Sequence, residues 1–412
     1  MTWVVIGAGY VGMEYERMCT VHEQHCVLVD VDKAKVEKLR ANGKDAYTWS
    51  TLPNNDQDTR VWVICAPTPV DDDLKPDERA VTAAAREVVA RVRTDDTVLL
   101  VSTVALRTLE LIQLMFADKD VCFAHVPERM CPGTTTPEQA VHLVGADRQG
   151  DVNAVITLLT SIGLRPMDVS SAKTAALAKL LENTKRDVNI ALLNEFALAA
   201  RHAGVSVHEV IAAAETKPGF NDTAFTPGLV GGHCIAVDPW LLVDGLVDGQ
   251  LAMTMHRPVF QPLRMCSSSL AAAARRVNDA TVGLVADLVG FPTDASNLAV
   301  VIGAAFKPNC PDVRNSGAAE LAEELMFRGW RVVLVDPIAD AQAFAKEFPR
   351  LDLRAEIPNE PTGAVVLAVV HDDCVVTEAY TANIVEHGVL ADPWAVAPWL
   401  MFHDDTRVYR TL

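Results

Sequence analysis

A glycine-rich turn near the N-terminus most constrains what this chain can fold into. Residues 3–9 are an apolar segment typical of a buried strand, and they run into Gly7-Ala8-Gly9-Tyr10-Val11-Gly12 and a helical stretch to about Glu23. In such a motif the first glycine allows a tight turn, the second lets backbone approach a pyrophosphate, and the third lets helix pack on strand. Because the helix N-terminus then faces the phosphates, the sequence predicts a dinucleotide site.

A carboxylate follows the second apolar strand. Residues 26–30 end in Asp30, the position from which an acid binds ribose hydroxyls, so the pattern favours NAD over NADP. A solvated strand end is the alternative role for Asp30. Lys35, on the next helix, could reach the cofactor or simply be exposed.

The first helix is unusually polar for one packed on a sheet. It carries Glu14, Glu16 and Arg17, and Glu14 places negative charge in the turn nearest the predicted phosphates. The sequence alone supplies no physical reason for these residues.

Strands and helices alternate beyond this point. Strands are predicted at 61–66, 97–103, 121–126 and 142–145, and helices at 78–93 and 105–117. Alternating units predict a parallel sheet covered on both faces, with ligands at the carboxyl ends of its strands. Thr68, Thr103 and Glu128 fall at such ends, although each taken alone is typical of a turn or helix cap.

A long helix is predicted from 171 to 203, without proline or glycine. Lys179, Asn183 and Arg186 are spaced i, i+4 and i+7, so they share one face. A solvated stripe is the ordinary reading of such a triple. An ammonium and an amide placed together could instead stabilise an oxyanion.

A cysteine lies between glycines and an Asp-Pro stop in residues 228–239. Cys234 follows Gly231 and Gly232 and precedes Asp238. Most cysteines outside disulfides are small buried hydrophobes, but a thiol on a glycine loop could act as a nucleophile. Residues 243–268 have no clear period and predict a long loop or small insertion, before a helix from Leu270 to Leu288.

The C-terminal part repeats the alternating architecture without the glycine motif. Strands are predicted at 298–303, 331–335, 364–370 and 389–391, with a helix up to about Arg328. Lys307 and Arg314 follow the first of these strands. They suit phosphate groups, although either could be surface charge.

Composition excludes several classes of protein. The 412 residues carry a net charge of -18, which argues against nucleic-acid binding through a general electrostatic footprint. The 9 cysteines are scattered without a CxxC pair, which indicates a reduced compartment and no zinc or other metal site. No leader precedes the first strand and no apolar run is long enough for a membrane span, so we expect a cytoplasmic protein.

Four ordered motifs resemble the UDP-glucose/GDP-mannose dehydrogenase family over nearly the whole chain. They are GAGYVG at 7–12, ENTKRDVNIAL at 182–192, GGHCIAVDP at 231–239 and FKPN at 306–309. The second and third are most similar to the branch that acts on UDP-N-acetylhexosamines, especially UDP-N-acetylmannosamine.

The resemblance implies an α/β fold in which two Rossmann-like domains with parallel sheets are joined by a long-helix, dimerising central domain. The expected domains are 1–170 for NAD, 171–295 for the helices and cysteine loop, and 296–412 for the nucleotide sugar. The implied reaction oxidises the sugar C6 hydroxyl to a carboxylate with two NAD, in a homodimer. UDP-glucose oxidation, or nucleotide-sugar binding without turnover, are the alternatives.

The resemblance also implies roles for particular residues. Cys234 would hold the sugar as a thiohemiacetal and then a thioester, with Lys179 and Asn183 stabilising the oxyanion. Asp238 would organise water and proton transfer, and Glu128 and Thr103 would serve hydrolysis. The predicted NAD contacts are Gly7, Gly9, Tyr10, Val11, Gly12, Asp30, Lys35, Thr68 and Arg314. The predicted substrate contacts are Arg129, Met130, Arg186, Gly232 and Lys307.

Three departures from the family pattern stand out. Residues 43–60 are shorter than usual, 243–265 look like an insertion, and Ala176 replaces a frequent glutamate. These departures affect the expected substrate more than the expected reaction.

Overall fold

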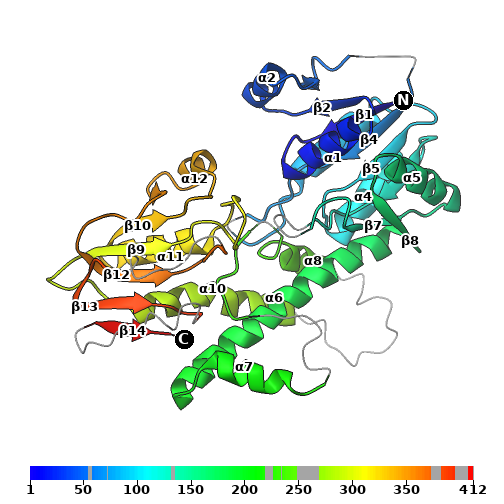
Figure 1. The fold of residues 1–412 in the computed structure, drawn as a ribbon. Helices are drawn as coiled ribbons and strands as arrows, with labels where there is room; N and C mark the ends of the chain where they lie inside the picture. Colours follow the sequence, from blue (N-terminus) through cyan, green and yellow to red (C-terminus); the bar gives the residue numbers. More distant parts are fainter. Residues whose placement is uncertain are drawn as a thin grey trace. The chain divides into compact units, whose positions relative to one another are not determined.

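The computed structural model describes residues 1–411 apart from 54–57, 72, 131–134, 219–225, 233, 248–268, 373–381 and 395–406. The chain divides into two compact units, drawn with their elements labelled in Figure 1. The first unit comprises Met1–Glu182 with Trp240–Cys266, and the second comprises Asn183–Pro239 with Ser267–Leu412. Each unit has its own sheet. The three-domain division expected from the sequence stays a prediction.

The first unit is built on an eight-stranded sheet in the order β3-β2-β1-β4-β5-β6-β7-β8. Its strands are β1 (Thr2–Ile6), β2 (Cys26–Val29), β3 (Ala46–Tyr47), β4 (Arg60–Ile64), β5 (Thr97–Leu100), β6 (Cys122–His125), β7 (Val141–Gly145) and β8 (Arg165–Val169). Its pairings are parallel, as predicted, except that β7 runs antiparallel to β6 through His125 and Gly145.

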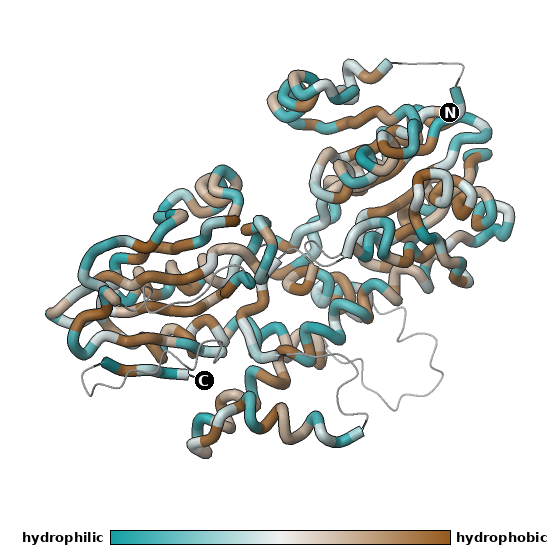
Figure 2. Tube along the Cα trace, viewed as in Figure 1, coloured by the Kyte–Doolittle hydropathy of each residue, from teal (hydrophilic) through white to brown (hydrophobic). Residues whose placement is uncertain are grey.

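Helices cover both faces of this sheet because strand side chains alternate between faces. Trp3 and Val5 of β1 join one apolar cluster with α1 (Tyr10–Val21) and α5 (Gln149–Ser161). Val4 and Ile6 join another with α3 (Arg79–Val89) and α4 (Leu106–Phe116). The short α2 (Lys33–Ala41) follows β2. In Figure 2 the strand traces are largely hydrophobic, whereas the helices alternate between hydrophilic and hydrophobic residues.

Along the chain, the described helices that follow β8 and precede the second sheet are α6 (Ala172–Ala203), α7 (Val207–Glu215), α8 (Asp238–Val247) and α10 (Leu270–Val289). The expectation of a loop from 243 onward is wrong at its start, because α8 continues to Val247. The rest of that stretch, 248–268, lies outside the described residues. Among the described helices, none is long and apolar enough to cross a bilayer.

The second unit is built on a six-stranded, wholly parallel sheet in the order β11-β10-β9-β12-β13-β14. Its elements are β9 (Leu298–Ile302), α11 (Gly317–Phe327), β10 (Arg331–Val335), α12 (Ala341–Glu347), β11 (Asp352–Arg354), β12 (Thr362–Leu367), β13 (Ile384–Ala391) and β14 (Val408–Arg410). The order matches the first six strands of the other sheet. In each sheet the direction of winding reverses at one place, between β1 and β4 or between β9 and β12, and such points favour ligand binding.

Candidate active site

The glycine turn of the first unit has an open position where a phosphate would approach. Gly7 has a φ of +90°, and a Cβ there would lie 2.6 Å from the Cys65 carbonyl oxygen. A Cβ on Gly12 would lie 2.0 Å from the Gly7 oxygen, so both glycines are required by the fold itself. A Cβ on Gly9 would meet nothing within 4 Å, directly before Tyr10 and Val11 begin α1. The open space and the helix N-terminus fit a dinucleotide pyrophosphate.

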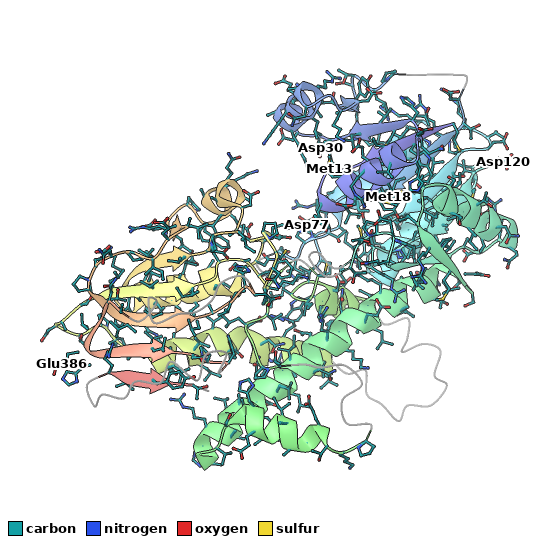
Figure 3. The ribbon with its side chains drawn as sticks, in the orientation of Figure 1. Met13, Met18, Asp30, Asp77, Asp120 and Glu386 are labelled. Atoms are coloured by element: carbon teal, nitrogen blue, oxygen red, sulfur yellow. The ribbon has the colours of Figure 1, made fainter. Side chains whose placement is uncertain are left out.

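Asp30 lies directly after β2 and is held in place (Figure 3). Its Oδ2 accepts from the Ala8 amide at 3.0 Å and pairs with Lys35 Nζ at 2.9 Å. Its Oδ1 accepts from the Asp32 amide at 3.0 Å. Burial alone would raise the pKa of Asp30, but these hydrogen bonds together lower it, so the carboxylate stays ionised. Of the two roles left open for Lys35, the structure gives it a contact with Asp30; its role toward NAD stays a prediction.

The polar residues of the first helix have partners in the same unit. Glu16, which is buried, accepts hydrogen bonds from Lys44 Nζ at 2.7 and 2.8 Å. Arg17 bridges Glu14 at 2.8 Å and Glu138 at 2.9 Å. These pairings supply the reason for the polar helix that the sequence alone did not.

The three polar residues predicted at strand ends do lie at one edge of the sheet. Thr68 Oγ1 donates to the Thr103 carbonyl at 2.8 Å, and the Glu128 amide donates to Val101 O at 3.3 Å. Glu128 Oε1 accepts from the amides of Arg129 and Met130 at 2.7 and 2.6 Å. The carboxylate is therefore fixed by the backbone that follows it.

Arg129 and Met130 are engaged by the protein itself. The Arg129 guanidinium binds Glu182 at 2.6 and 3.1 Å and donates to the Val141 carbonyl at 2.8 Å. Met130 is buried. Their roles in substrate binding stay predictions.

Cys234 is exposed and follows the glycines of its loop, in the turn that leads into α8 at Asp238. Its carbonyl accepts from the Asp238 amide at 2.8 Å, and Asp238 Oδ2 accepts from Asn183 Nδ2 at 2.5 Å. Lys179 lies one turn before Asn183 on α6 and is buried, whereas Arg186 is exposed. The structure thus brings Cys234, Asp238 and Asn183 together. His233 lies outside the described residues.

The glycines before the cysteine pack on the connection that follows β9. Gly232 has a φ of +81°, and a Cβ there would lie 2.7 Å from the Phe306 ring. A Cβ on Gly231 would lie 2.5 Å from the Asn315 carbonyl oxygen. The Gly232 amide donates to the carbonyls of Arg314 and Asn315, at 3.2 Å each. The glycines of the cysteine loop therefore pack on residues 303–315. We call residues 303–315 the β9 connection.

Two cations predicted from the sequence lie on the β9 connection. Lys307 Nζ lies 5.6 Å from the centre of the Phe306 ring. Hydrogen bonds to Asp312 raise the pKa of Arg314, and the nearby Cys234 adds a smaller electrostatic contribution. Because Arg314 interacts with Cys234, both belong to one electrostatic environment. The NAD-binding role predicted for Arg314 is untested.

The sequence interpretation missed the residues that anchor the start of the cysteine loop. Asn194 on α6 accepts from the Gly228 amide at 2.9 Å and donates to its carbonyl at 3.1 Å. Asn194 also donates to Asn278 at 2.9 Å, and Asn278 donates to the buried Asp187 at 2.7 Å. Arg275 completes the cluster with an ion pair to Asp187 at 2.5 Å. Polar residues seven apart on an alanine-rich helix, as Asp187 and Asn194 are, were the available signal.

These observations define a class of protein. One unit has the glycine turn and acid of a dinucleotide-binding sheet, and the other repeats the strand order with cations beside an exposed cysteine. Such a pairing is that of a dinucleotide-dependent enzyme with a second nucleotide-binding unit.

Comparison with known proteins identifies the family. Models of the NAD binding, central and UDP binding domains of the UDP-glucose/GDP-mannose dehydrogenase family match residues 43–149, 173–260 and 300–397. The chain belongs to this family, and the resemblance and fold predicted from the sequence are confirmed.

Individual relatives agree with this assignment. "Protein CapL" of Staphylococcus aureus is 31% identical over 94% of each chain. The UDP-N-acetyl-D-glucosamine 6-dehydrogenase of Pseudomonas aeruginosa is 29% identical over 90% of each chain. The solved UDP-D-ManNAc dehydrogenase of Pyrococcus horikoshii superimposes with a TM-score of 0.77 at 25% identity, covering 100% of this chain and 99% of that one.

The comparisons also confirm the predicted enzyme class and cofactor. The protein is an NAD-dependent nucleotide-sugar 6-dehydrogenase with a UDP-sugar substrate. The particular sugar and the roles of single residues remain predictions.

Proposed function

We propose that the protein oxidises the C6 hydroxyl of a UDP-N-acetylhexosamine similar to UDP-N-acetylmannosamine to the uronic acid, through covalent intermediates on Cys234. The observation that carries this proposal is the exposed Cys234, whose carbonyl accepts from the amide of Asp238 while the Asp238 carboxylate accepts from Asn183, on a loop anchored to α6 and the β9 connection. The choice of an acetamido sugar is supported by the central motifs and by relatives named for such sugars.

The proposed steps balance as two oxidations and one hydrolysis. NAD, when bound, would supply the hydride acceptor, one molecule for each oxidation. The C6 alcohol first loses a hydride and its hydroxyl proton, which gives the aldehyde. Cys234 Sγ adds to the C6 aldehyde while its proton goes to the carbonyl oxygen, giving a thiohemiacetal. Loss of a hydride and the hydroxyl proton gives the thioester. Water then attacks the thioester carbon, the C–S bond breaks, and the thiol and a carboxylate are released.

Asn183 and Lys179 would stabilise the negative oxygen that develops at C6. One N–H of the Asn183 amide donates to Asp238, which leaves its second N–H for the substrate oxygen. A preorganised amide and an ammonium in a partly buried setting are suited to this task. Asp238 would organise water and proton transfer, and Glu128 and Thr103 would serve the hydrolysis.

We further propose a homodimer that covers the apolar face of α6 and acts in the cytoplasm, where its thiols stay reduced. Leu181 is 65% exposed, and Leu192 and Phe196 are each 49% exposed. Their helical spacing, with that of Leu177, places all of them on one face. Light scattering after size exclusion should give twice the chain mass, and Leu181→Glu with Phe196→Glu should give the monomer; a monomeric wild type would contradict the proposal.

The test of the reaction is a panel of UDP-sugars assayed for NADH and for uronic acid, with Cys234→Ser in parallel. The wild type should form two NADH per acetamido sugar, and Cys234→Ser should form no acid. Cys122→Ser is the matched control, because burial raises the pKa of its thiol to about 12 and it should leave turnover unchanged.

Each other outcome counts against part of the proposal. Full acid formation by Cys234→Ser would refute the covalent role. A strong preference for UDP-glucose would favour the alternative substrate. UDP-sugar and NAD binding without NADH formation would indicate a binding protein without turnover.

A further inference from the structure

A buried histidine holds the β9 connection in the second unit. The side chains of His371 and Asp336 are 2% and 0% exposed, and Nε2 of His371 lies 3.0 Å from Asp336 Oδ2. The other ring nitrogen, Nδ1, accepts from the Asn309 amide at 2.8 Å. Because a backbone N–H can only donate, Nδ1 carries the lone pair and the proton lies on Nε2. His371 is therefore held as one neutral tautomer.

Asp336 is a fixed support for this histidine. Its Oδ2 accepts from the amides of Ala304 and Ala305 at 2.8 and 3.0 Å. Its Oδ1 accepts from the amides of Ile338 and Ala339 at 3.0 and 2.9 Å. Although burial alone would raise the pKa of Asp336, hydrogen bonds from these amides and from His371 lower it. An ionised Asp336 accepting from neutral His371 satisfies the donors around it.

The residue held by His371 has an uncommon backbone conformation. Asn309 has a φ of +57°. Its side chain donates to Asp372 Oδ2 at 2.7 Å and accepts from the Asp372 amide at 2.9 Å. Asn309, which lies two positions after Lys307, is thus held by hydrogen bonds to two successive residues, His371 and Asp372.

The same connection supports the cysteine loop. The Phe306 amide donates to the Asp312 carbonyl at 3.0 Å, and the Phe306 ring lies where a side chain on Gly232 would have to go. Gly232 is two residues before Cys234. A displacement of residues 306–309 would therefore reach both Lys307 and the cysteine loop.

We propose that His371 is a positioning residue that sets the β9 connection for the UDP-sugar and, through Phe306 and Gly232, sets the cysteine loop. This inference rests on the proposed function, because the roles of Lys307 and Cys234 are taken from it. Its distinctive requirement is the acceptor at Nδ1, because that atom alone joins the buried pair to Asn309.

Two substitutions separate the two ring nitrogens. In His371→Gln the amide can reach the position of Nε2 and donate to Asp336, but nothing replaces Nδ1. In His371→Asn an amide oxygen can take the position of Nδ1 and accept from Asn309. We expect His371→Gln to weaken UDP binding, measured by calorimetry, and to raise KM for the UDP-sugar, each about 10-fold. His371→Asn should restore UDP binding to within about 3-fold of the wild type.

Two further readouts distinguish positioning from a loss of stability. KM for NAD should stay within about 2-fold in His371→Gln, since the loss falls on the nucleotide sugar. The rate at which iodoacetamide modifies Cys234, followed by peptide mass spectrometry, should change in the same variant. Thr362→Val is the control, because it removes a hydrogen bond of 3.0 Å from the buried Thr362 to the Glu360 carbonyl at the opposite end of β12. It should leave UDP binding and Cys234 reactivity unchanged.

Asp372→Ala removes the second contact that holds Asn309. It leaves the buried core unchanged, since Asp372 is exposed. It should weaken UDP binding about 3-fold, so the proposal remains testable if His371→Gln does not fold. Wild-type UDP binding in either His371→Gln or Asp372→Ala would overturn it. Equal losses for UDP and NAD in His371→Gln, without recovery in His371→Asn, would also overturn it. A wild-type protein that binds no UDP would instead refute the proposed function.

Discussion

The two units place an aspartate at the same position of the same strand order and use it differently. Asp30 after β2 accepts two backbone amides, pairs with the half-exposed Lys35 and keeps 11% of its side chain exposed. Asp336 after β10 accepts hydrogen bonds from four backbone amides and a buried histidine, and its side chain has no exposed surface. The Asp30 carboxylate remains accessible to a ligand, whereas the hydrogen bonds of the Asp336 carboxylate hold the backbone of its own unit in place. Equivalent positions in a repeated topology therefore need not share a function.

The glycines that follow the first strand of each unit also differ between the two units. Gly7 and Gly303 both have a φ of +90°, and a Cβ on either would meet a carbonyl oxygen, that of Cys65 at 2.6 Å or of Val369 at 2.0 Å. The turn after the first strand requires glycine in both units. Only the first unit adds Gly9, with open space beside it. The shared glycine serves the fold, whereas the additional one is predicted to serve the ligand.

The largest effect is expected for Gly303→Ala. Its Cβ would overlap the Val369 oxygen and occupy an unfavourable φ, so we expect a loss of about 5 kcal/mol in the free energy of unfolding. Denaturant titration would measure it. Gly283→Ala is the control, because α10 leaves its Cβ unobstructed and the change should be neutral or stabilising. Equal stability for the two variants would break the comparison between the units.

A smaller effect is expected for Asp336→Asn, at about 3 kcal/mol, because buried donors would lose their charged acceptor. The pKa of Asp336 is lowered in the folded protein, so its stabilisation is present above the unfolded pKa of about 3.9 and is lost as pH falls through the folded value. Urea titrations at neutral and acidic pH should therefore show the variant and wild type converging in acid. A pH-independent difference would contradict the assigned charge.

Gly9→Ala should separate folding from binding in the first unit. With nothing within 4 Å of the added Cβ and a φ of -78°, stability should change by less than about 0.5 kcal/mol. NAD affinity, measured by calorimetry, should fall about 10-fold, because the methyl group would occupy the space predicted for the pyrophosphate. Unchanged NAD affinity would remove the assigned role of Gly9.

The smallest effect is expected for Asp30→Asn. It should raise KM for NAD about 3-fold and reduce the discrimination against NADP, while lowering stability by less than about 1 kcal/mol. Steady-state kinetics with both cofactors would measure this. A loss of stability as large as that of Asp336→Asn would show that the two aspartates are equivalent after all.

Features with a local cause could be predicted from the sequence. The central strands are runs of apolar residues, such as 61–64 and 298–302, and the helices between them have regular apolar spacing. Elements without such patterns were missed. β3 has only 2 residues, and β8 is largely exposed with the sequence RPMDV. The antiparallel direction of β7 depends on how the chain returns to the sheet, which no local pattern records.

The sequence by itself determined the alternating units, the glycine turn with Asp30, and the cysteine that follows two glycines, because sterics and side-chain periodicity act over a few residues. Only the tertiary structure decided which polar groups meet. Asp187 and Arg275 are 88 residues apart, and Asp336 and His371 are 35 apart. A buried charge needs a partner, since an unpaired buried charge is costly in free energy. Burial does not determine where along the sequence that partner lies. Partners at many separations along the chain would satisfy each group, and the packing within the second unit selects one.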